Sequence, residues 1–366
     1  MNVALHPRKQ AMPLEPIKQL DIENYGCIQK ASFALTPLHA LIGPNDSGKS
    51  TTLRALRTIA RCATEDQPGR KPDQAFEPMW GYESRMQVEY SDGVRYRVLS
   101  DHEQGGLQID YSHGAISAGL RRPWDRHPGW SDIGKKLELV VSVWNRLVHA
   151  TMVRFDPNAL RRPAAQILSE QPIRFFDETG WGLASVYQAI NSRDVDVFVA
   201  IRDKVRGFFP TIQNILVPNI QGGEVVLQAK LVDNTIVPAE AVSEGLLYFL
   251  GFTALQHLAE SKLFLVEEPE NGLHPARIAE VMAILREISK TSQVVIATHS
   301  PLVVNELKGD EISIVTRDPA TGTKVTLLKD VPGFEEASKV YQPGEFWVSY
   351  CDGNMEAPLL SGSQRS

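Results

Sequence analysis

One eight-residue segment of the chain carries residues suited to binding phosphate groups: Gly43-Pro44-Asn45-Asp46-Ser47-Gly48-Lys49-Ser50. It matches the pattern G-x-x-x-x-G-K-[ST] in full. The short apolar run His39–Ile42 precedes it, and Leu53, Leu56 and Ile59 follow at three-residue spacing, so a strand leads in and a helix leads out. Glycines let backbone N–H groups close around phosphates, and the helix N-terminus adds its positive dipole end. The sequence therefore predicts a nucleotide-phosphate site.

Within this segment two side chains have assigned tasks. Lys49 is expected to reach the β- and γ-phosphates of ATP, and the Ser50 hydroxyl is expected to bind Mg²⁺. We count the next residue, Thr51, with the same nucleotide-binding set. ATP and Mg²⁺ are thus the predicted cofactors.

Two adjacent carboxylates end a later apolar run. Leu263–Val266 reads as a buried strand and runs directly into Glu267-Glu268-Pro269-Glu270. A carboxylate at the C-terminal edge of a parallel strand can face the phosphate loop. Glu267 is therefore predicted to hold magnesium, directly or through water, and Glu268 to orient or deprotonate the attacking water.

Two further positions complete the candidate site. His299 ends the next buried run, Val294–Ala297, and can hydrogen-bond the γ-phosphate or the attacking water. Ser243 is a good N-cap residue for a helix that leads toward the carboxylate strand, and Gly245 lets a phosphate approach the first turn. Both strand ends and this helix start are thus candidate functional positions.

The elements that position these residues follow from hydrophobic periodicity. The last third of the chain alternates strand and helix, and Pro275 stands where a helix should begin. Asp92-Gly93 and Asp233-Asn234 are hairpin turn signals, and 101–134 reads as irregular. The expected strands and strand pairs are 17–25, 30–35, 86–91 with 94–99, and 224–232 with 235–237, and the expected helices are about 135–150, 181–192, 195–208 and 243–261.

Composition limits the class of protein. With 43% apolar and 22% charged residues the chain is globular, and its net charge of −6 restricts any nucleic-acid contact to a local patch. Three scattered cysteines without C-x-x-C spacing predict a reduced, intracellular protein without structural zinc. No apolar run approaches the ~20 residues that span a bilayer, and no secretion signal is evident. We expect a cytoplasmic protein with no membrane partner.

Together these motifs resemble an ABC-type ATPase head, over residues 17–56 and about 225–320. The run from Glu267 to Pro275, EEPENGLHP, is similar to the "EEPExxLHP" of the non-transporter branch, which holds the SMC and RecF group and the OLD-like ATPases of bacterial defence systems. Thr298-His299-Ser300-Pro301 resembles its "THSP", and Ser243-Glu244-Gly245 its reduced signature sequence. The full LSGGQ-like signature is absent, and a glutamate replaces the commoner magnesium-binding aspartate.

The resemblance implies an α/β P-loop NTPase fold: a mostly parallel central sheet, an antiparallel β subdomain and an inserted helical lobe. It also implies a homodimer with two composite sites, in which Ser243 and Gly245 of one subunit face the ATP of the other. Hydrolysis is expected to be slow and regulated. The predicted boundaries are a loose tail at 1–16, one domain at 17–355 (nucleotide-binding core 17–62 and 225–330, insertion lobe 63–224) and a disordered tail at 356–366.

Some assignments stay open between alternatives. The glutamine-loop residue of this class is not assigned: Asp156 and Gln166 lie in the expected region, but neither matches it. Tyr25 either stacks on adenine or packs in the core. Asp194-Val195-Asp196 has the D-x-D spacing of metal nucleases but opens a predicted helix, where residues two apart do not face together. We therefore predict no nuclease site there.

Two functions fit these motifs. The first is a defence ATPase that controls a separately encoded nuclease or toxin, because the span after His299 is too short for a TOPRIM nuclease domain. The second is a RecF/SMC-like clamp that closes on DNA in repair or maintenance. A transport subunit is disfavoured by the "LHP" and "THSP" forms. The arginines and tryptophans at 121–130 either contact nucleic acid or another protein, or are solvated and packed.

Overall fold

The computed structural model describes residues 15–64, 83–101, 106–122, 133–147, 150–258, 261–318 and 322–350. The expected tails at 1–16 and 356–366, and the loop expected at 63–80, fall largely outside these residues. So does most of the arginine–tryptophan segment, since only 121 and 122 of it belong to a described strand. No helix among the described residues is long and apolar enough to cross a membrane.

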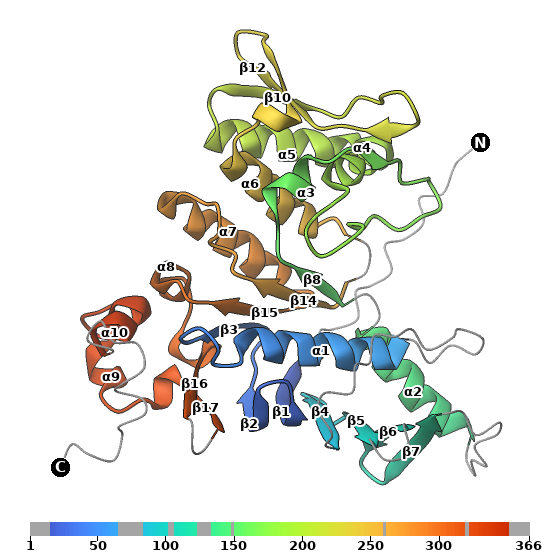
Figure 1. Cartoon of the computed structure of the whole chain (residues 1–366), viewed down its shortest axis with the longest axis vertical. Helices are drawn as coiled ribbons and strands as arrows, with labels where there is room; N and C mark the ends of the chain where they lie inside the picture. The colour runs from blue at the N-terminus through green and yellow to red at the C-terminus, as the bar shows by residue number, and fades with distance from the viewer. Residues whose placement is uncertain are drawn as a thin grey trace.

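A six-stranded, mostly parallel sheet forms the centre of the molecule, which confirms the predicted α/β class. Its order is β17-β16-β3-β15-β14-β8, and only β17 runs antiparallel to its neighbour. The strands are β3 (Leu38–Ile42), β8 (Thr151–Val153), β14 (Leu263–Glu267), β15 (Gln293–Thr298), β16 (Ile312–Asp318) and β17 (Gly322–Leu327). Because β3, β14 and β15 are parallel, their carboxyl ends share one edge (Figure 1).

A second six-stranded sheet is antiparallel, in the order β2-β1-β4-β5-β6-β7. Its strands are β1 (Ile17–Tyr25), β2 (Ile28–Ala34), β4 (Ser84–Tyr90), β5 (Arg95–Asp101), β6 (Gly106–His113) and β7 (Ile116–Arg122). The Asp92-Gly93 hairpin is confirmed, but the interpretation of 101–134 as irregular is wrong where β6 and β7 form a hairpin. The alternation that marks β6 is short, with Ile109 and Tyr111 buried.

Helix α1 (Lys49–Thr64) lies between the two sheets (Figure 1). The predicted apolar residues Leu53, Leu56 and Ile59 are fully buried there. Alternate residues of the central strands face this layer, for example Leu265 of β14 and Val295 of β15. Their neighbours face the opposite layer, so the central sheet is covered on both faces, as its uninterrupted apolar strands require.

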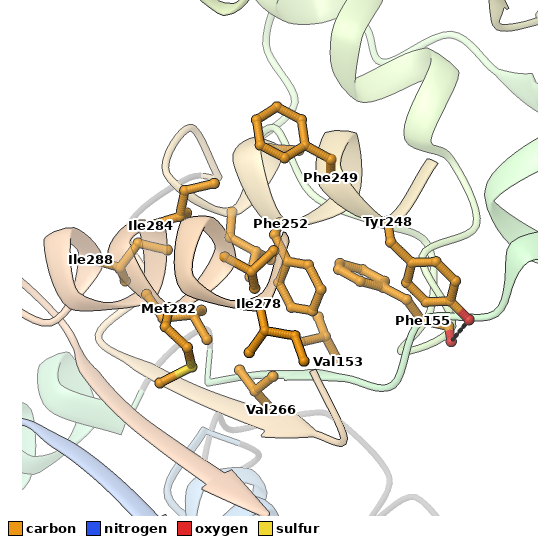
Figure 2. Packing of buried hydrophobic residues seen from close by; sticks show 14 of the residues in the cluster. Val153, Phe155, Tyr248, Phe249, Phe252, Val266, Ile278, Met282, Ile284 and Ile288 are labelled. Atoms are coloured by element: carbon orange, nitrogen blue, oxygen red, sulfur yellow. Dashed lines mark hydrogen bonds between the residues drawn. The ribbon is translucent and has the colours of Figure 1, made fainter. Parts of the chain in front are cut away.

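The opposite face of the central sheet is covered by α6 (Glu244–Leu255) and α7 (Pro275–Ile288) (Figure 1). Pro275 is the first residue of α7, as predicted. Figure 2 shows Phe252 of α6 packed beside Phe155, with ring centroids 5.0 Å apart, and the Tyr248 hydroxyl donating to the Phe155 carbonyl. Helix α6 is shorter than the expected 243–261.

A helical layer stands beyond α6, built from α3 (Pro157–Arg161), α4 (Leu183–Arg193) and α5 (Val195–Phe208). Small sheets border it, with strands β9 (Ala164–Ala165), β10 (Ile212–Leu216), β11 (Glu224–Val225), β12 (Gln228–Leu231) and β13 (Ile236–Pro238). The hairpin expected at 224–237 is therefore divided: β11 pairs with β9, and only β12 pairs with β13.

The remaining helices lie at the edges. They are α2 (Ile133–Leu147), α8 (Pro301–Asn305), α9 (Phe334–Ala337) and α10 (Pro343–Tyr350), with short 3-10 turns at Ala239–Ala241, Gly309–Glu311 and Leu328–Asp330. The central sheet takes β8 from within the span 63–224 that the sequence assigns to an insertion. The domain boundaries themselves stay a prediction.

Candidate nucleotide-binding site

The phosphate loop follows β3 directly and its glycines are required by the fold. A Cβ on Gly43 would lie 1.9 Å from the Val315 carbonyl oxygen of neighbouring β16, so no larger residue fits. Gly48 has φ = 110°, a conformation that L side chains rarely adopt. Asp46 also has positive φ, at 62°, in the middle of the turn. The sequence thus folds into a tight loop at the carboxyl edge of the central sheet.

Lys49 is held inside this loop. Its ammonium group donates to the carbonyl oxygens of Gly43 at 2.7 Å and of Pro44 at 2.6 Å. Burial lowers the pKa of Lys49, and nearby acidic side chains raise it; these acids are Glu268, Asp46, Glu270 and Glu267. The cation therefore lies among four carboxylates at the loop, where a phosphate group would find its only loop-placed ammonium.

Ser50 and Glu267, the predicted magnesium pair, are brought together. The Ser50 hydroxyl donates to one carboxylate oxygen of Glu267, across 217 residues of sequence. The other Glu267 oxygen lies 3.8 Å from a guanidinium nitrogen of Arg154, at the end of β8. A hydroxyl beside a carboxylate is a donor set that suits Mg²⁺, which takes oxygen ligands and keeps several waters.

Glu268 lies next to this pair in an unusual backbone conformation. Its φ is 48°, one of four positive values among non-glycine residues of the described chain. Its amide donates to the Ala297 carbonyl at 2.8 Å, and Asn271 donates to its carboxylate at 2.6 Å. The other Glu268 oxygen lies 3.6 Å from Nδ1 of His299. Strained backbone held by surrounding contacts is a feature of functional sites.

Glu270, in the turn after β14, connects this turn to the end of β15. The sequence did not predict this connection. One of its oxygens accepts from the Thr298 hydroxyl at 2.7 Å and from the His299 amide at 3.3 Å. Its side chain is 9% exposed, and its second oxygen is buried without a hydrogen-bond partner among the described residues. The third glutamate of the EEPE run, two residues after Glu268, was the available signal. Glu270 positions His299.

The other loop residues differ in their surroundings. The Ser47 hydroxyl is buried and has no hydrogen-bond partner in the part of the chain that the structure describes, so the loop holds an unused polar group. The Thr51 hydroxyl lies 3.4 Å from the Cys27 sulfur, at the back of the loop. Asn45 is exposed. Within the described residues no group of three or more His, Cys, Asp or Glu side chains could hold a metal by itself.

The proposed signature positions lie at the start of α6, on the face of the central sheet opposite α1 (Figure 1). Ser243 is the N-cap, and its hydroxyl accepts from the Leu246 amide at 3.4 Å. A Cβ on Gly245 would meet nothing within 4 Å. Within the described chain no hydrogen bond or ion pair joins Ser243 or Gly245 to the phosphate loop. The fold therefore does not bring them to the loop of the same chain.

The structure shows local contacts for Asp156, Gln166 and Tyr25, whose roles the sequence left open. Asp156 caps α3 through the Asn158 and Ala159 amides, and the Gln166 amide donates to Asn219, so each has a local structural partner. The Tyr25 hydroxyl pairs with Thr58 at 2.9 Å, its ring borders the core, and burial raises its pKa.

The D-x-D segment behaves as expected. Asp194 is the N-cap of α5 and accepts from the Val197 amide at 3.0 Å, while Asp196 is exposed in the first turn. The two carboxylates therefore open a helix, as the sequence analysis predicted.

Residues 38–305 match the model of a protein family described as "AAA domain, putative AbiEii toxin, Type IV TA system". The chain belongs to this family. The matched range covers well over half of the sequence and runs from β3 to α8, so it includes the phosphate loop, Glu267, Glu268 and His299. The predicted AAA-type resemblance is thereby confirmed.

Individual relatives agree with this family. A 43-residue stretch is 40% identical to part of the OLD nuclease of Thermus scotoductus; it covers 12% of this chain and 8% of the nuclease, a small part of that protein's length. The fold resembles the SMC head domain of Pyrococcus furiosus, solved bound to the C-terminal domain of ScpA, with a TM-score of 0.52 and 12% identity over 90% of this chain and all of the other. The SMC head domain from Thermotoga maritima aligns with a TM-score of 0.42 and 12% identity over 85% of this chain and 98% of the other. The match with a TM-score of 0.52 confirms the predicted P-loop ATPase head fold.

Proposed function

We propose that this chain hydrolyses ATP with Mg²⁺, dimerises when ATP is bound, and acts through a separately encoded effector, such as a nuclease or toxin of a bacterial defence system. One observation carries the ATPase part. The carboxyl edge of one sheet gathers Lys49 in the loop, the Ser50–Glu267 pair, and Glu268 beside His299. These are the side chains that phosphoryl transfer requires: a phosphate cation, a metal-binding pair and a group to handle water.

The charges of the site favour a metal-bound nucleotide. Four carboxylates act electrostatically on Lys49, so a free polyphosphate would meet several charges of its own sign. Bound Mg²⁺ would supply charge neutralisation at the terminal phosphates. Ser50 and Glu267 are placed to hold it, and Lys49 and the loop amides are placed to hold the phosphates.

Glu268 and His299 would then complete the site. Glu268 is proposed to orient the attacking water and accept its proton, because its carboxylate is fixed by Asn271 and projects from a strained backbone. His299 is proposed to hydrogen-bond the γ-phosphate or that water. Glu270 holds the histidine backbone in place for this role.

The signature end of α6 supports the dimer. Gly245 sits in the first turn of α6 with open space around it, although alanine would favour a helix more than glycine does. Ser243 and Glu244 are exposed beside it. A bare backbone at a helix N-terminus suits the close approach of a phosphate from outside the chain. We propose that the ATP of a second copy occupies this place.

The effector part rests on family and fold. The chain belongs to a family whose description names a toxin and a toxin–antitoxin system, and an SMC head of similar fold was solved bound to another protein. ATP binding would change the contacts of the dimer, and a second protein would respond to that change.

The test uses the purified full chain. We expect slow release of phosphate with Mg-ATP, and a doubling of mass by light scattering with ATP but not with ADP. No hydrolysis and no nucleotide-dependent mass change would contradict the ATPase proposal.

The effector proposal is tested separately. The same preparation is incubated with single-stranded DNA, duplex DNA and RNA in the presence of Mg-ATP, and we expect no cleavage. Cleavage that survives Lys49→Ala would place a nuclease in this chain. ATP-dependent retention on duplex DNA without any other protein would favour a clamp of the RecF/SMC kind over effector control.

A further inference from the structure

Arg154 occupies a distinctive place at the carboxyl edge of the central sheet. β8 pairs in parallel with β14, and Val153 lies opposite Val266. Arg154 is the next residue and therefore stands beside Glu267, the proposed magnesium ligand. The chain is fixed as it leaves β8, because the Arg154 amide donates to the Glu178 carbonyl at 2.8 Å. The backbone thus delivers this side chain to the site.

The guanidinium of Arg154 is close to Glu267 but not bound tightly. The nearest nitrogen–oxygen distance is 3.8 Å, which is an ion pair without a hydrogen bond, and the side chain is 62% exposed. Two other arginines of the same segment are committed to other groups. Arg161 donates to the Val242 carbonyl, and Arg162 stacks on Trp181 at 4.5 Å. Arg154 is therefore the one of these three that can change partner at little cost.

The chemistry of Glu267 provides a reason for such a change. Its first oxygen accepts from Ser50, and its second faces Arg154. A divalent cation held by Ser50 and Glu267 would satisfy the carboxylate and repel the guanidinium. The terminal phosphate of a bound nucleotide would then offer the guanidinium another anionic partner. Arginine suits this task, since its planar fork of N–H donors matches phosphate oxygens.

We propose that Arg154 is a phosphate-binding residue of the ATP site: it neutralises Glu267 without nucleotide and contacts the γ-phosphate when Mg-ATP is bound. It would thereby favour ATP over ADP. This inference rests on the proposed ATPase function. It adds a phosphate-binding residue near this strand end, where Asp156 and Gln166 are both engaged in local contacts.

The experiment measures equilibrium binding of ATP and of ADP by calorimetry, each with Mg²⁺ and with EDTA. In Arg154→Ala we expect ATP with Mg²⁺ to bind about tenfold more weakly, the size of a lost charge-assisted hydrogen bond. Binding of ADP should change less than about twofold. Arg154→Lys should recover only part of the loss, because an ammonium cannot form the two-pronged contact.

Two reference variants make the outcome decisive. Arg162→Ala removes an arginine of the same segment that stacks on Trp181, and it should leave both affinities unchanged. Lys49→Ala should abolish tight binding of both nucleotides. If Lys49→Ala binds normally, the proposed ATP site itself is wrong. If Lys49→Ala fails to bind while Arg154→Ala binds ATP normally, or loses ATP and ADP equally, only the role of Arg154 is refuted.

Discussion

The phosphate loop and the start of α6 are both glycine-containing helix entrances, yet their surroundings differ sharply. At the loop, Gly43 is pressed against the Val315 carbonyl and Gly48 needs a positive φ, so this chain's own fold demands both glycines. At α6, a side chain on Gly245 would meet nothing within 4 Å. One glycine pair is explained from within the chain. The single Gly245 has no such explanation among the described residues.

The difference separates the part of the proposed ATP site that one chain assembles by itself from the part that a second chain would supply. The loop, the magnesium pair and the proposed base are assembled by one sheet edge and connected by internal hydrogen bonds. The start of α6 lies on the other face of that sheet and is exposed. A site that is built within one chain except for one exposed helix end is what a composite dimer site predicts.

The largest expected effect concerns the internally built site. Glu268→Gln should slow ATP hydrolysis by about two orders of magnitude or more, as expected when a general base is lost. Nucleotide binding should persist, and an ATP-bound dimer should accumulate in light scattering. Glu287→Gln, at an exposed glutamate paired with Lys290, is the matched control and should hydrolyse normally. Normal hydrolysis by Glu268→Gln would move the base elsewhere, with Glu270 examined first.

A smaller effect is expected at the turn that follows Glu268. Gly272 has φ = 67°, and a Cβ there would lie 2.1 Å from the Tyr248 ring of α6. Gly272→Ala should destabilise the fold by about 1–3 kcal/mol and slow hydrolysis, because the turn that carries Asn271 must shift. Gly333→Ala supplies the control: φ is also positive, at 82°, but nothing crowds the position.

The two variants separate crowding from backbone strain. The temperature of thermal unfolding and the rate of phosphate release should both be lowered more by Gly272→Ala than by Gly333→Ala. Equal losses of stability with unchanged hydrolysis would show that the contact between this turn and α6 does not position the site.

The smallest effect has opposite signs in two measurements. Gly245→Ala should raise the stability of the isolated chain slightly, by about 0.5 kcal/mol, because alanine favours the helix and finds free space. It should nevertheless weaken ATP-dependent dimerisation, because a methyl group would stand where the partner's phosphate approaches. If Gly245→Ala is both more stable and fully able to dimerise, the proposed reason for a glycine at position 245 is wrong.

Much of the site was readable from the sequence because its motifs are local. The strand–loop–helix around Lys49, and the strand that ends at Glu267, are marked by apolar runs that stop at chemistry-bearing residues. Pro275 marked the start of α7 for the same reason. Short-range pattern and turn chemistry decide these features.

The parts that the sequence could not supply depend on distant pairing. β8 is three residues long and carries no periodicity, so only its pairing with β14 reveals Arg154 beside Glu267. The link from Glu270 to Thr298 joins the turn after β14 to the end of β15, with the whole of α7 between them in sequence. The hairpin of β6 and β7 was hidden because only a few residues alternate, and its burial depends on the sheet next to it.

The central claim, that two copies share each ATP site, has one direct test. A Lys49→Ala chain has a defective phosphate loop and an intact α6 entrance, and a Ser243→Arg chain has the reverse. Each should be inactive alone. Mixed in equal amounts, they should form heterodimers with one intact composite site. Each heterodimer should then show up to about half of the ATPase activity of a wild-type dimer, which has two such sites. No recovery in heterodimers whose formation has been confirmed by mass would contradict the shared site.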